Sequence, residues 1–80
     1  MTHKILSRRS QRDVHIDQAM ERYVEWREEC LAVEDAYTNW SSAPAGEAEL
    51  PYAAYGAALD REQSAAAFYS RALVRLERGL

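Results

Sequence analysis

Apolar residues recur along this chain at alternating spacings of three and four, first between positions 16 and 40 and again between 52 and 76. Such spacing places each series along one side of an α-helix, in the pattern by which helices pack against one another. A stretch rich in serine, alanine, proline and glycine separates the two series and favours a turn. We therefore predict an all-α protein, an antiparallel two-helix hairpin with helices over about 14–40 and 50–78 and a loop over 41–49.

The two series face each other in a single register when the chain folds back at the loop. Trp40 then faces Tyr52 and Tyr37 faces Tyr55. The residue numbers of each facing pair add up to 92. We call this predicted line of contact the seam. It comprises Ile16, Ala19, Tyr23, Trp26, Cys30, Val33, Tyr37 and Trp40 on the first helix, and Tyr52, Tyr55, Leu59, Glu62, Ala66, Tyr69, Leu73 and Leu76 on the second.

A lone two-helix hairpin is a poor way to bury a core, because each helix offers only one side to the other. Small proteins compensate with disulfides, metals or oligomerisation, and a single cysteine allows no disulfide within the chain. Further apolar residues flank the seam and need a partner, either a second copy or a different helical protein that completes a four-helix bundle. They are Met20, Val24 and Leu31 on the first helix, and Ala54, Ala58, Ala65, Phe68 and Ala72 on the second.

Gly56 interrupts the second predicted helix. A glycine inside a helix costs about 1 kcal/mol relative to alanine. Either the two helices approach each other closely beside it, or it is merely tolerated.

Charge is distributed unevenly, although the net charge is only −3. Residues 1–12 carry four basic and no acidic side chains, whereas residues 13–49 carry ten acidic and two basic ones. We predict a flexible basic N-terminal arm over 1–12, with order beginning at Asp13 or His15 and with Asp13 and Asp17 as possible N-caps or first-turn acids. The arm offers possible phosphate contacts at Lys4, Arg8, Arg9 and Arg12.

An acidic stripe follows the first helix and has two interpretations. It consists of Asp17, Glu21, Glu25, Glu28 and Asp35. Like charges at this spacing repel one another, so basic residues should lie nearby. Interhelical ion pairs with Arg71, Arg75 and Arg78 are the structural interpretation, and docking of a basic partner is the functional one.

The motifs of catalysis are missing from the sequence. It has no glycine-rich phosphate loop, no nucleophile elbow and no Glu-x-x-His pair for a metal, so we predict no catalytic residue, metal or cofactor. The one unusual polar position is Glu62, which the register places opposite Cys30. We expect Glu62 to reach the edge of the seam and to pair with Arg27 or Arg61, and a ligand or redox role is the alternative.

These observations predict a noncatalytic helical interaction or adaptor protein, acting as a homodimer or within a helical complex. The chain has neither a signal peptide nor an apolar run long enough for a membrane span, so we expect a cytoplasmic protein without membrane contact. A nucleic-acid-associated regulator using the basic arm is the alternative. A small-molecule or redox sensor around Cys30 and Glu62 is a further one.

Overall fold

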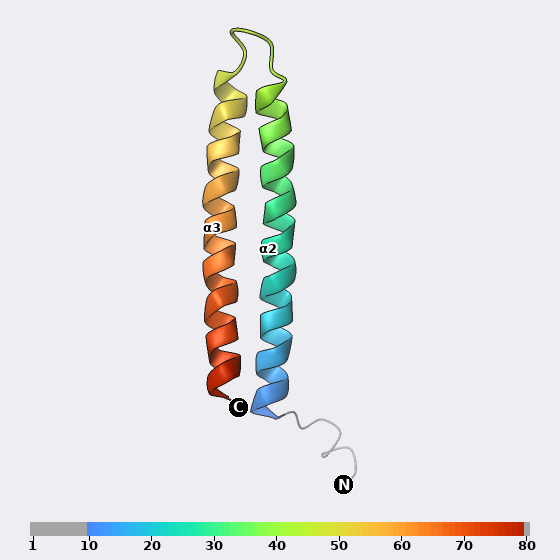
Figure 1. Ribbon diagram of the computed structural model, residues 1–80, viewed down its shortest axis with the longest axis vertical. Helices are drawn as coiled ribbons and strands as arrows, with labels where there is room; N and C mark the ends of the chain where they lie inside the picture. The colour runs from blue at the N-terminus through green and yellow to red at the C-terminus, as the bar shows by residue number, and fades with distance from the viewer. Residues whose placement is uncertain (1–9, 80) are drawn as a thin grey trace.

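The computed structural model describes residues 10–79 and consists of two long helices that run side by side in opposite directions (Figure 1). Helix α2 spans Gln11–Ser41 and helix α3 spans Glu49–Arg78. No strand occurs within the described range. The predicted antiparallel helical hairpin is therefore confirmed.

Helix α2 begins earlier than the apolar pattern predicts. Ser10 is its N-cap, and the side-chain oxygen of Ser10 accepts a hydrogen bond from the backbone N–H of Asp13 at 3.0 Å. The predicted start at Asp13 or His15 is wrong, and neither Asp13 nor Asp17 is the cap, whereas the alternative prediction of Asp13 as a first-turn acid is correct. Asp13 lies instead in the first turn, where a carboxylate favours the positive end of the helix. Arg12 consequently belongs to the helix and not to the arm.

The connection between the helices is held by short hydrogen bonds. At the end of α2 the carbonyl oxygen of Thr38 accepts from both the backbone N–H and the hydroxyl of Ser42, the latter at 2.6 Å. A turn follows in which Glu47 N–H donates to the carbonyl of Pro44, and Gly46 adopts the positive φ of 86° that favours glycine. The predicted loop is correct to within one residue at each end.

Helix α3 carries Pro51 in its first turn, as expected from the missing N–H of proline, and ends at the cap residue Gly79. Here the two chain ends of the hairpin come together. A Cβ atom added to Gly79 would lie 2.8 Å from Nδ1 of His15, at the beginning of α2. Glycine therefore allows the last turn of α3 to approach the first turns of α2.

Aromatic contacts fix the register of the hairpin. Ring centroids are 5.5 Å apart for Tyr23 and Tyr69, 5.6 Å for Tyr37 and Tyr55, and 5.0 Å for Trp40 and Tyr52. In all three pairs the residue numbers add up to 92, as the predicted register requires.

The most deeply buried residues are small. Ala19, Ala58 and Ala72 are the described residues that fall in the buried class, and Ala58 is only 1% exposed. The assignment of Ala58 and Ala72 to an outward flank is therefore wrong. Together with Pro51 and Ala65 they recur at every seventh position of α3, and small side chains there let α2 approach closely and cover them. The contact is shifted from the predicted seam toward these residues.

Candidate interaction surface

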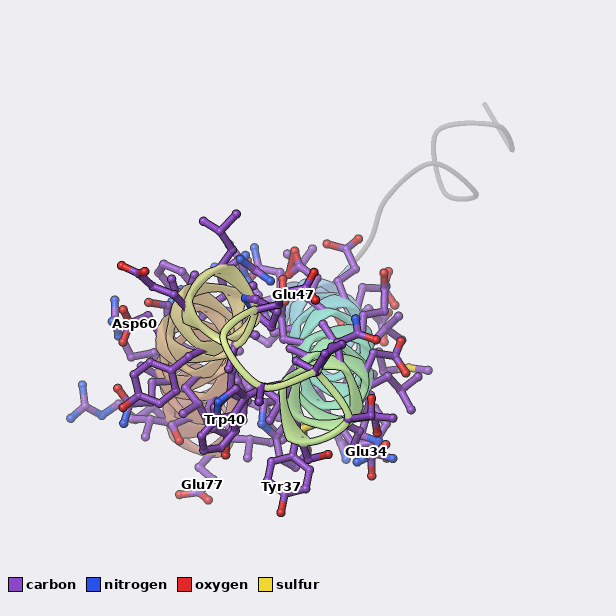
Figure 2. The ribbon with its side chains drawn as sticks, turned by 90° about the horizontal axis from the view of Figure 1, so that it is seen from above. Glu34, Tyr37, Trp40, Glu47, Asp60 and Glu77 are labelled. Atoms are coloured by element: carbon purple, nitrogen blue, oxygen red, sulfur yellow. The ribbon has the colours of Figure 1, made fainter. Side chains whose placement is uncertain are left out.

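The shift of the helix contact leaves large apolar and aromatic side chains exposed on one side of the hairpin. Five large side chains of the predicted seam and its margin are exposed, and we call the surface that they form the tyrosine face: Met20, Tyr23, Tyr37, Tyr52 and Leu59. Met20 is 63% exposed and Tyr52 58%. Seen along the helix axes, the side chain of Tyr37 extends outward beside the junction between α2 and α3 (Figure 2).

A groove of about 500 Å³ lies in the terminal half of this face. Residues of both helices line it, and all of them are apolar or aromatic: Ile16, Ala19, Met20, Tyr23, Val24, Tyr69 and Leu76. Val24 extends the surface onto the outer side of α2, where Leu31 is also exposed. Exposed apolar surface of this kind is typical of a site for another protein.

Aromatic rings stiffen both halves of the tyrosine face. In the terminal half, Trp26 stacks on Tyr69 with ring planes 16° apart, and Tyr23 packs against both. In the half near the loop, Trp40 stacks on Tyr55 with planes 15° apart. Tyr37 packs edge-on against both of these rings, and Tyr52 packs against Trp40 with its ring tilted by 55°. The rings that reach solvent are therefore held by rings behind them.

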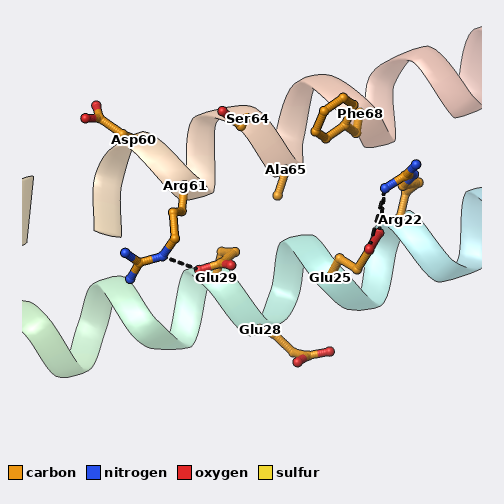
Figure 3. Close-up of a pocket in the computed structure, with 9 residues that line it drawn as sticks. All are labelled: Arg22, Glu25, Glu28, Glu29, Asp60, Arg61, Ser64, Ala65 and Phe68. Carbon is orange, nitrogen blue, oxygen red and sulfur yellow. Dashed lines mark hydrogen bonds and ion pairs between the residues drawn. The ribbon is translucent and has the colours of Figure 1, made fainter. Parts of the chain in front are cut away.

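The opposite side of the hairpin is charged, and we call it the charged face. It contains a shallow hollow of about 430 Å³ (Figure 3), lined by Arg22, Glu25, Glu28, Glu29, Asp60, Arg61, Ser64, Ala65 and Phe68. Arg61 Nε donates to Glu29 across the helices at 3.3 Å, and Arg22 donates to Glu25 within α2 at 3.0 Å. The guanidinium groups of Arg22 and Arg71 each lie 5.0 Å from the ring centre of Phe68.

The predicted flank is thus not one surface, and this prediction needs correction. Met20 and Val24 border the groove of the tyrosine face, whereas Ala65 and Phe68 lie in the charged hollow. Ala54 lines a third hollow, beside Leu50. Phe68 is covered in part by guanidinium groups, so it does not continue an apolar surface.

Glu62 has a partner different from those predicted. Its carboxylate accepts a hydrogen bond from the indole N–H of Trp26 at 2.7 Å, in a partly buried position. Arg61 pairs with Glu29 instead, and Arg27 lies over the Trp26 ring with its guanidinium carbon 5.8 Å from the ring centre. Glu62 therefore serves the packing of an aromatic side chain.

Cys30 is a free and half-buried thiol. No group of histidine, cysteine and acidic side chains suited to a metal ion occurs within residues 10–79.

The acidic stripe of α2 lies mostly in solvent. Glu21, Glu28 and Asp35 are exposed, Glu25 is bound by Arg22, and Asp17 is half-buried. An interhelical ion pair joins Arg61 and Glu29, which belong to neither of the predicted charged sets.

Of the predicted phosphate contacts, Lys4, Arg8 and Arg9 lie outside the described residues, and Arg12 is exposed in the first turn of α2. Neither of the described helices is long and apolar enough to cross a membrane. Comparison of the chain with known protein families, with curated proteins and with solved structures gives no match.

Proposed function

We propose that this chain is a noncatalytic helical interaction protein whose tyrosine face is covered by another helical surface, in a homodimer or in a complex with a different helical protein. The observation that carries the proposal is the exposure of Met20, Tyr23, Tyr37, Tyr52 and Leu59 on one side of a hairpin whose buried residues are alanines. So small a core supplies little hydrophobic stabilisation, and covering the tyrosine face adds to it.

The free-energy cost of burying a face in an interface differs between the two faces of the hairpin. The charged face has cation and anion partners within the chain, and burying such pairs in an interface removes them from water at a high cost. The groove of the tyrosine face is apolar, so its burial carries no such penalty. Rings already packed against one another also lose little side-chain freedom on binding. These differences favour the tyrosine face as the contact surface.

The test compares two double variants that place the same lysine pair on different sides. Met20→Lys with Val24→Lys changes the groove of the tyrosine face, and Leu50→Lys with Ala54→Lys changes exposed positions of the third hollow. Lysine is a good helix former, so both variants keep the helices.

We expect the first variant to lose association, whether with itself or with a protein retained from its cells of origin, and the second to keep it. Equal behaviour of the two variants, with helix content unchanged, would exclude the tyrosine face as the interaction surface.

A further inference from the structure

We infer that the occupant of the tyrosine face is the tyrosine face of a second copy, in a four-helix bundle in which α2 of each copy lies on α3 of the other. This inference rests on the proposed function and adds the identity of the partner and its orientation. In this arrangement a two-fold axis runs parallel to the helices, and both loops lie at the same end. Every helix then has only antiparallel neighbours, as in common four-helix bundles.

The side of the hairpin that carries the tyrosine face has the size that a stable dimer needs. Helices of 31 and 30 residues give a face about 45 Å long at 1.5 Å per residue and about 20 Å wide for two helices side by side. Such a face covers about 900 Å² per copy, close to the roughly 800 Å² per partner of a standard stable interface. A second hairpin of the same dimensions therefore covers the face completely.

At two levels of this face, large side chains of α2 lie beside small residues of α3. On α2, Met20, Tyr23 and Tyr37 protrude into solvent. On α3, Tyr52 and Leu59 also protrude, but the register places the small residue Ser70 at the level of Met20 and Tyr23, and Gly56 at the level of Tyr37. A two-fold axis along the helices brings the protruding residues of α2 onto these small residues of the other copy. An axis across the helices would instead set α2 on α2 and α3 on α3, so these levels would no longer meet.

Gly56 is an independent sign of an approaching partner. A Cβ atom at this position would meet no atom within 4 Å, so nothing in the hairpin itself requires glycine there. The prediction that α2 approaches closely beside Gly56 is therefore wrong. Nevertheless, a glycine in mid-helix weakens α3, and its place next to Tyr52 and Leu59 leaves room on the tyrosine face for a side chain from another molecule.

The first experiment measures the mass of the purified chain by light scattering over a concentration series. We expect about twice the 9.1 kDa of one chain. Gly56→Leu should raise the dissociation constant about tenfold or more, because the new side chain occupies the space of the partner. It should still form the hairpin, because leucine is the better helix former. Ala57→Leu, an exposed change one position away, is the control and should leave the dissociation constant unchanged.

The orientation is tested by a distance between the two loops. A single cysteine at the exposed position of Ala45, introduced in a Cys30→Ser background, carries a spin label. Loops at the same end give a label separation below about 25 Å, whereas loops at opposite ends give about 45 Å, the length of the helices. The longer distance would overturn the orientation proposed here.

The outcomes also separate this inference from the proposed function. A monomer at all concentrations overturns the second copy as occupant. If that monomer still retains another protein, and Met20→Lys with Val24→Lys abolishes the retention, the proposed function stands with a different partner. If neither self-association nor retention depends on the tyrosine face, both fail.

Discussion

Replacing Ala58 by leucine tests whether the hairpin is built around its small residues. Ala58 is 1% exposed, and the side chain gains three carbon atoms for which neighbouring groups must move. Overpacking of this kind costs about 1–3 kcal/mol, while the difference in helix propensity between alanine and leucine is small. For a chain of this size that is a large part of the stability, since such cores rarely supply more than about 3–5 kcal/mol.

Urea unfolding followed by far-ultraviolet circular dichroism measures the effect, with all chains at one fixed concentration. With a slope of about 1 kcal/mol per molar urea, Ala58→Leu should lower the unfolding midpoint by about 1–3 M. Ala57→Leu is the matched control, because Ala57 is the exposed neighbour and surface changes usually stay within about 0.5 kcal/mol. Equal midpoints for the two variants would refute the placement of Ala58 beneath α2, and with it the shifted contact that exposes the tyrosine face.

Three further variants test single contacts. Glu62→Ala should lower the free energy of unfolding by about 1–3 kcal/mol because it leaves the indole N–H of Trp26 without its acceptor, whereas Glu62→Gln keeps an acceptor and should cost less. Tryptophan fluorescence during unfolding measures both variants, and equal losses of stability would contradict the hydrogen bond. Ser10→Ala should cost about 0.5–2 kcal/mol and speed amide exchange at Asp13, and unchanged exchange would argue against the cap. Arg61→Ala should lower the free energy of unfolding by less than about 1 kcal/mol, because its ion pair with Glu29 is largely exposed, and this loss should vanish at high salt. A larger, salt-independent loss would mean that Arg61 contributes more than this ion pair.

The architecture and the register follow from the sequence because large aromatic residues determine them. Both apolar series are regularly spaced and a short loop joins them. Folding back at the loop therefore brings Tyr37 against Tyr55 and Trp40 against Tyr52. The N-cap was also visible, because Ser10 precedes an acidic residue by three positions, the spacing of a capping box. The apolar pattern begins later than the helix does, and a start assigned from that pattern alone misses the cap.

The rotation of each helix about its own axis could not be predicted in the same way. Ala54, Ala58 and Ala65 look alike in the sequence, yet only Ala58 is fully covered. Which alanines are buried depends on how closely the backbones approach, and a periodic pattern does not contain that distance. The partner of Glu62 was missed for a related reason, because the rotation of the helices decides that the indole N–H of Trp26, and not an arginine, reaches its carboxylate.

The two aromatic clusters lie at different distances along the chain from the turn. We expect this difference to determine the order in which their contacts form during folding. The contact of Trp40 with Tyr52 closes a loop of about 12 residues, whereas that of Tyr23 with Tyr69 closes about 46, a difference of roughly 1.2 kcal/mol in closure entropy. We therefore expect contacts at the turn to form first and the helices to pack progressively toward their other ends. Trp40 and Trp26 sit one in each cluster, so the chain carries its own fluorescent reporters of the early and the late stage of folding.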